Sequence, residues 1–147
     1  MEKYITKSFE DTQKLGENLA KEILEFKTSS SAVVLALQGD LGAGKTTFLQ
    51  GFAKGLGIKE IVNSPTFVIM KKFELKNNEF KYFYHFDCYR LNEAEEILHL
   101  GFKEIISDPK NIVAIEWPEK LGDLLPQNAI KISFEHLSED ERELTIN

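Results

Sequence analysis

The residues most clearly suited to chemistry lie between Gly39 and Thr46. They read Gly-Asp-Leu-Gly-Ala-Gly-Lys-Thr, a phosphate-binding loop of the Walker A kind. Glycines let the backbone come close to a phosphate and turn successive N–H groups toward it. Lys45 is then expected to reach the β- and γ-phosphates, and the Thr46 hydroxyl to bind Mg²⁺. The pattern predicts a site for a nucleoside triphosphate and its magnesium ion.

Such a site also needs a carboxylate to hold Mg²⁺, and in α/β sheets we expect it at the carboxyl end of a strand. Two acids qualify. Glu116 follows the apolar run 112–115, and Asp87 ends the aromatic run 82–86. Either acid could instead merely end a strand or cap a turn. Glu116 is the stronger candidate, because an apolar run followed by an acid is the Walker B form.

Other polar and aromatic residues leave alternatives open. Thr66 lies in a Ser-Pro-Thr turn that could sense the γ-phosphate as a switch does, or could be only a turn. His85 lies within the aromatic run and is expected in the core. His99 and His136 have no partner at metal-ligand spacing and are expected at the surface, and Trp117 is expected to pack.

The elements that must position these residues follow from hydrophobic spacing. The phosphate pattern lies between an apolar strand, 32–37, and a helix that begins near Lys45, as its mechanism requires. The remaining elements, in chain order, are an edge strand 3–9, a helix 12–26 capped by Ser8 or Asp11, a hairpin of 67–75 with 80–86, a helix 93–100 capped by Asn92, a helical piece in 101–108, a strand 111–116, a short helix 118–125, and an antiparallel pair 129–136 with 143–146. The order predicts a three-layer α/β domain of the P-loop NTPase kind with a mixed central sheet.

The composition limits the class of protein. A chain of 147 residues with 42% apolar residues suggests one globular domain, residues 1–147. A net charge of −6 with only two arginines argues against tight, unaided binding of RNA or DNA. The single cysteine excludes an internal disulfide. The chain shows neither an apolar run long enough to span a membrane nor a secretion signal, so we expect a cytoplasmic protein.

Four blocks together resemble the bacterial TsaE family, formerly YjeE. They are residues 39–46, Ser-Pro-Thr-Phe at 64–67, His-Phe-Asp-Cys-Tyr-Arg-Leu at 85–91, and Ile-Glu-Trp-Pro-Glu at 115–119. The opening residues 8–12 are similar as well. The resemblance implies a small ATPase, using ATP and Mg²⁺, needed to make threonylcarbamoyladenosine at position 37 of tRNAs that read codons beginning with A. It implies action on a TsaB–TsaD pair, in which TsaD transfers the threonylcarbamoyl group, and contact with tRNA only through that complex.

The resemblance also implies roles for single residues. Lys45 binds phosphate, Thr46 and Glu116 bind Mg²⁺, Asp87 is a second metal-side or water-positioning acid, and Thr66 is the switch residue. The implied nucleotide-binding residues are Thr12, Asp40, Leu41, Gly42, Ala43, Gly44, Lys45, Thr46 and Thr47. Residues 8–12 are implied to touch the base or ribose. Cys88 stands where the family often has leucine, and the C-terminal strand pair is the least family-specific part, so Arg142 receives no role.

Three rival functions use the same phosphate loop. A small-molecule kinase needs cations and a lid to clamp the transferring phosphoryl group, and two arginines supply little material for one. A GTPase is disfavoured because the guanine-reading sequence Asn-Lys-x-Asp is absent from the chain. A binding module that holds ATP without hydrolysing it is not separated from a slow ATPase by sequence.

Overall fold

The computed structural model describes residues 1–26, 29–40, 42–60 and 69–147. These residues form two compact units. The first unit contains the phosphate loop with β1 (Glu2–Thr6), α1 (Phe9–Phe26), α2 (Lys45–Gly55), β6 (Ile130–His136) and β7 (Arg142–Ile146). The second contains β2 (Val33–Gln38), β3 (Met70–Glu74), β4 (Tyr82–Asp87), the 3₁₀-helix η1 (Ala94–Leu100), α3 (Phe102–Ser107), β5 (Asn111–Glu116) and the 3₁₀-helix η2 (Pro118–Leu124). One terminal residue of β2 and one of β6 fall in the other unit.

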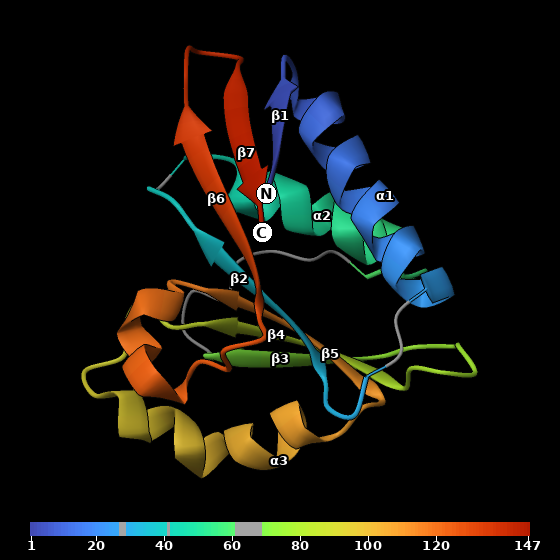
Figure 1. Cartoon of the computed structure of the whole chain (residues 1–147), viewed down its shortest axis with the longest axis vertical. Coiled ribbons are helices and arrows are strands. Elements are labelled where there is room, and N and C mark those ends of the chain that lie inside the picture. The colour runs from blue at the N-terminus through green and yellow to red at the C-terminus, as the bar shows by residue number, and fades with distance from the viewer. Residues whose placement is uncertain (27–28, 41, 61–68) are drawn as a thin grey trace. The chain divides into compact units, whose positions relative to one another are not determined.

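The strands of the first unit form an antiparallel ribbon in the order β1-β7-β6 (Figure 1). Leu144 at the middle of β7 pairs with Tyr4 on one side and Phe134 on the other. The predicted C-terminal antiparallel pair is therefore confirmed. The N-terminal edge strand is confirmed as well, but it ends at Thr6 and not at Phe9, because Phe9 already begins α1. Leu144 is fully buried. The face of the ribbon that carries Leu144 is therefore covered by other parts of the protein.

Helix α1 begins at Phe9, earlier than the predicted start at Thr12. The cause is its cap, because Ser8 Oγ accepts a hydrogen bond of 3.1 Å from the backbone N–H of Asp11. Ser8 is thus the N-cap. The Asp11 carboxylate in turn accepts from the N–H of Lys7 at 3.0 Å.

Helices α1 and α2 lie side by side and meet through small residues (Figure 1). A Cβ atom added to Gly51 would lie 1.9 Å from the carbonyl oxygen of Gln13, and one added to Gly16 would lie 2.2 Å from that of Phe48. Only residues without a side chain permit so close an approach. For this reason Gly16 and Ala20 are buried in α1, together with Thr12 and Ile23, whereas Leu15 and Leu19 are only half-buried.

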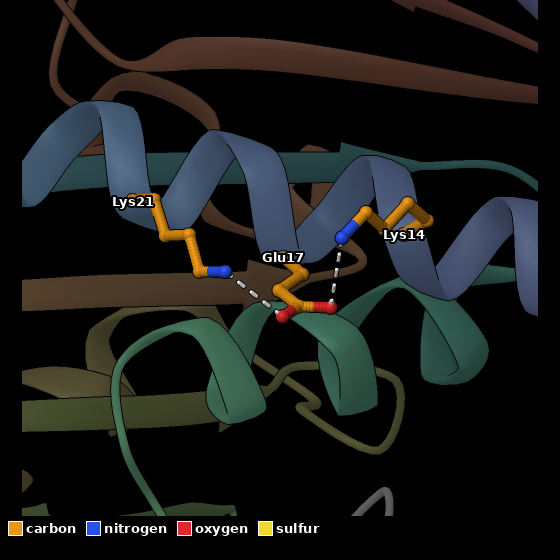
Figure 2. A network of polar contacts seen from close by, with 3 residues as sticks. All are labelled: Lys14, Glu17 and Lys21. Carbon is orange, nitrogen blue, oxygen red and sulfur yellow. Dashed lines mark hydrogen bonds and ion pairs between the residues drawn. The ribbon is translucent and has the colours of Figure 1, made fainter.

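Helix α1 also carries an ion-pair network, drawn in Figure 2. Glu17 Oε1 accepts a hydrogen bond of 3.1 Å from Lys21 Nζ, and Glu17 Oε2 lies 3.9 Å from Lys14 Nζ. The hydrogen bond from Lys21 lowers the pKa of Glu17. Both lysine side chains are more than half exposed, so this network adds little to stability.

The second unit contains a mixed sheet, as predicted. Strands β2, β5 and β4 are parallel neighbours, and β3 joins β4 as an antiparallel hairpin strand. The carboxyl ends of the parallel strands lie in register, with Leu37 beside Glu116 and Glu116 beside Asp87. The chain leaves β2 at this same edge and enters the phosphate loop.

Alternation along these strands separates two faces of the sheet. One face carries Val34, Phe86 and Ile115 into an apolar cluster with Ile97 of η1 and Phe102 of α3, and Figure 1 shows α3 below the strands. The period of two then places Phe83, His85, Asp87, Ala114 and Glu116 on the opposite face. The polar residues with possible chemistry therefore share one face.

Two predicted helices differ from expectation. The helix predicted at 93–100 is the 3₁₀-helix η1, and its N-cap is Glu93, not Asn92. The reason is Glu96, whose carboxylate accepts from the N–H groups of both Asn92 and Glu93, at 2.8 and 3.1 Å. The helix predicted at 118–125 is η2, interrupted by non-helical angles at Gly122. Among the described residues, no helix is long and apolar enough to cross a membrane.

Candidate functional site

The phosphate loop has the backbone that its glycines allow. Gly42 and Gly44 have φ of 79° and 105°, in the left-handed region that disfavours side chains. The N–H of Ala43 closes a turn onto the carbonyl of Asp40 at 3.1 Å, and α2 begins at Lys45. A helix N-terminus preceded by such a loop presents N–H groups and a positive dipole end to an anion. The loop therefore fits a phosphate chain.

Lys45 lies across this loop. Its side chain is buried, and its Nζ donates a 2.7 Å hydrogen bond to the carbonyl oxygen of Gly39. The ammonium group thus spans from the helix start to the first residue of the loop. This conformation places the positive charge of Lys45 beside the N–H groups of the loop.

Residues outside the motif support the loop from the C-terminal ribbon. A Cβ at Gly39 would lie 2.9 Å from the carbonyl oxygen of Phe134, so the strand β6 permits only glycine there. The Arg142 guanidinium donates to the carbonyl of Gly42 at 3.3 Å and to that of Ser138 at 3.0 Å. The sequence assigned Arg142 no role. Its contact with Gly42 could have been inferred only from the position of β7 beside the loop.

Thr12 of α1 reaches the loop through its methyl group. The hydroxyl of this buried residue lies 2.7 Å from the hydroxyl of Thr6, while its Cγ2 would be 3.8 Å from a Cβ on Gly44. The structure therefore places Thr12 beside the predicted nucleotide-binding residues. Its role in binding stays a prediction.

A cavity of about 400 Å³ lies beside the loop in the first unit. Its lining residues are Asp40, Ala43, Phe134, Glu135 and His136. Two of them, Asp40 and Ala43, belong to the predicted nucleotide set. Thr47, also in that set, is half-buried in the first turn of α2. Leu41 and Thr66 lie outside the described residues.

Glu116 and His85 form a buried pair at the carboxyl edge of the second unit. His85 Nε2 lies 2.7 Å from Glu116 Oε2, and the two side chains are only 1% and 4% exposed. The prediction that His85 is buried is confirmed, but its partner is a candidate metal ligand. Sequence reasoning missed this contact, because it depends on the register that sets β4 beside β5.

Asp87 is paired in register with Glu116 and is half-buried. Its Oδ1 accepts a 3.0 Å hydrogen bond from the N–H of Tyr89, so this acid does cap the turn after β4. The next residue, Cys88, is fully buried, and burial raises the pKa of its thiol to about 12. Cys88 is thus an apolar, unreactive residue, as expected for a position that is often leucine.

Trp117 immediately follows Glu116 and has left-handed angles, with φ of 57°. Its ring lies 5.0 Å from that of exposed Tyr89, centroid to centroid, and packs against the apolar cluster of the second unit. The packing role predicted for Trp117 is confirmed. His99 and His136 are exposed, also as predicted.

Each unit offers single residues whose chemistry suits magnesium that a nucleotide would largely hold. Within the described residues, no group of three or more His, Cys, Asp or Glu side chains could hold a metal ion. Mg²⁺ commonly takes one or two protein oxygens, with phosphate and water completing its octahedron. Threonine hydroxyls and carboxylates are ligands of that kind, so Thr46 in the first unit and Glu116 in the second each have suitable chemistry.

The chain was compared with known proteins. A family model described as threonylcarbamoyl adenosine biosynthesis protein TsaE matches residues 6–144. The chain belongs to the TsaE family. Its relatives include tRNA threonylcarbamoyladenosine biosynthesis protein TsaE of Bacillus subtilis, 45% identical over 112 residues that cover 76% of this chain and 67% of that protein. The Treponema pallidum protein of the same name is 33% identical over 142 residues, covering 97% of each chain.

A solved structure agrees with this assignment. The crystal structure of Bacillus subtilis YdiB matches with a TM-score of 0.72 and 33% identity, covering 99% of this chain and 83% of that one. The predicted α/β class, P-loop NTPase-like with a mixed sheet, is thereby confirmed, as is the predicted resemblance. Family membership connects this chain with the biosynthesis of tRNA threonylcarbamoyladenosine.

Proposed function

We propose that this TsaE-family chain binds ATP with Mg²⁺ and hydrolyses it slowly, as an accessory protein for threonylcarbamoyladenosine formation at position 37 of tRNAs that read codons beginning with A. One observation carries the proposal: the left-handed glycines at 42 and 44 open onto α2, with Lys45 across the loop. The family match over residues 6–144 supports the pathway. Because tRNA modification of this kind uses cellular tRNA, we assign the function to the cytoplasm.

Each site residue has a chemical role in this proposal. Lys45 and the loop N–H groups bind the phosphates, and the Thr46 hydroxyl and Glu116 carboxylate hold Mg²⁺. Asp87 is a second metal-side or water-positioning acid. When bound, Mg²⁺ neutralises charge on the β- and γ-phosphates.

We further propose that the chain acts on a TsaB–TsaD-like pair and meets tRNA only through that complex. The net charge of −6 and the two arginines support this, because nucleic-acid affinity rests largely on Lys and Arg. One of those arginines, Arg142, donates to backbone carbonyls of its own turn and loop. A phosphate site poor in arginine can be completed by a cation from a partner. In known nucleotide switches such a cation raises the rate of hydrolysis by roughly 10³–10⁵-fold.

Phosphate release from ATP, measured with and without the purified pair, tests the proposal. We expect slow release by the chain alone and faster release with the pair. Association measured by analytical ultracentrifugation should be strongest with ATP and Mg²⁺. Absence of release in both conditions would instead identify a nucleotide-dependent binding module, and ATP-dependent phosphorylation of a small metabolite would identify a kinase.

Thr66→Ala probes the coupling between nucleotide and partner. We expect this variant to bind ATP nearly as the wild type does and to lose stimulation by the pair, since a switch residue reports the γ-phosphate to a partner. Full stimulation of Thr66→Ala would remove Thr66 from the mechanism without affecting the nucleotide site.

A further inference from the structure

The His85–Glu116 contact is more than the packing of a core histidine. Both side chains are almost completely buried, and 2.7 Å separates Nε2 from Oε2. An ionised carboxylate only accepts hydrogen bonds, so we assign the ring proton to Nε2. Burying a charge requires such partners. His85 supplies one of them from a neighbouring strand of the same sheet.

The other ring nitrogen shows that stability alone does not explain a histidine here. Among the described residues, Nδ1 of His85 has no hydrogen-bond partner and is inaccessible to solvent. Such a buried, unsatisfied polar atom is destabilising. The same face of β4 accommodates the fully buried hydrocarbon ring of Phe83, so a phenylalanine at position 85 would suit the core better. What histidine provides is the bond to Glu116.

From this geometry, and resting on the proposed function, we infer that His85 is a positioning residue for Mg²⁺. It holds the Glu116 carboxylate in one orientation through Nε2–H. A glutamate side chain has three rotatable bonds, and a hydrogen bond to a ring fixed on the adjacent strand restricts them. Partners of this kind, behind a metal ligand, typically change metal affinity by about 10–100-fold when removed.

A pair of amide variants separates positioning from packing. In His85→Gln the side-chain N–H reaches about as far as Nε2, whereas in the shorter His85→Asn it reaches only about as far as Nδ1. We expect His85→Asn to raise the Mg²⁺ concentration that half-saturates ATP binding by about 10–100-fold, and His85→Gln to raise it much less. Metal-free ATP affinity should stay within about twofold of wild type in both, because Lys45 and the loop are unchanged. His99→Asn, at an exposed histidine of η1, is the matched control.

Calorimetric titration of ATP at a series of Mg²⁺ concentrations measures the half-saturating Mg²⁺ concentration. The melting temperature of each variant measures its stability. Because His85 acts through Glu116, His85→Asn should add nothing to the Mg²⁺ defect of Glu116→Ala. Equal Mg²⁺ half-saturation in wild type, His85→Gln and His85→Asn, even with lowered melting temperatures, would overturn the inference and leave His85 structural. A wild-type chain that binds ATP independently of Mg²⁺ would overturn the proposed metal role as well, so the two failures are distinguishable.

Discussion

The phosphate loop and the carboxyl edge of the β2-β5-β4 sheet are built by different means. The loop is made of backbone: its left-handed Gly42 and Gly44 aim N–H groups, and the first turn of α2 continues them. The edge is made of side chains: Glu116 and His85 are buried against each other, with Asp87 beside them in register. Backbone sites depend on a few consecutive residues, whereas side-chain sites depend on how distant strands align.

This difference predicts how each region responds to substitution. The loop should fail mainly when the Lys45 ammonium is lost or when the helix behind it cannot pack. The edge should fail in steps, because in our proposal Glu116 and Asp87 both serve one ion and His85 positions Glu116.

The largest expected effect is that of Lys45→Ala on nucleotide binding. Removing one charge-assisted contact should cost about 1.5–3 kcal/mol of ATP binding free energy. Titration calorimetry measures this directly, and Lys54→Ala, at an exposed lysine of the same helix, should bind as the wild type does. Unchanged ATP affinity in folded Lys45→Ala would mean that the loop is not the phosphate site.

Substitutions at the carboxyl edge of the β2-β5-β4 sheet should have a smaller effect than Lys45→Ala, and one confined to Mg²⁺-dependent steps. Glu116→Gln should weaken Mg²⁺-dependent ATP hydrolysis more than metal-free nucleotide binding, and Asp87→Asn should do so less strongly, because Asp87 is also occupied in capping the turn at Tyr89. Activity measured against Mg²⁺ concentration distinguishes the two. Glu119→Gln, at an exposed glutamate nearby in the chain, is the control. An equal loss of binding with and without Mg²⁺ would contradict the metal role.

Gly51→Ala tests the support of the loop. The new Cβ would lie 1.9 Å from the carbonyl oxygen of Gln13, so α1 and α2 must separate. Overpacking of this kind costs about 1–3 kcal/mol, offset in part by the roughly 1 kcal/mol by which alanine favours a helix over glycine. We expect a net loss of stability in urea unfolding, while Lys54→Ala stays within about 0.5 kcal/mol of wild type. A variant as stable as Lys54→Ala would show that the helices have room to adjust.

The same contrast explains what the sequence could predict. The loop, the strand ends at Asp87 and Glu116, and the order of elements along the chain follow from local patterns, and the structure confirms them. The contacts between His85 and Glu116 and between Arg142 and Gly42 could not be predicted, because they join residues 31 and 100 positions apart. Strand register decides the first contact, and the ribbon beside the loop decides the second.

Helix α1 shows the same limit on a smaller scale. Its amphipathic period was read correctly, but its most buried face contains Gly16 and Ala20, not Leu15 and Leu19. Hydrophobic spacing finds the large apolar residues. It does not reveal that a second helix carries Gly51 and Gly55 at the contact, where small residues allow the closest approach.

The smallest expected effect concerns Glu17, a glutamate in surroundings opposite to those of Glu116. Glu17 faces two exposed lysines, and the hydrogen bond from Lys21 lowers its pKa (Figure 2). A lowered pKa in the folded state stabilises the fold above the unfolded value of 4.5, and this contribution is lost as the pH falls through the folded pKa. Glu17→Gln should therefore flatten the acid side of the stability curve slightly, and high salt should erase the difference by screening. Chemical unfolding at pH 3 to 7, with Glu22→Gln on the same helix as control, measures it. A large Glu17→Gln effect, or one that persists in high salt, would show that the Glu17–Lys21 contact is not weak and screened. The contrast with buried Glu116 would then lose its basis.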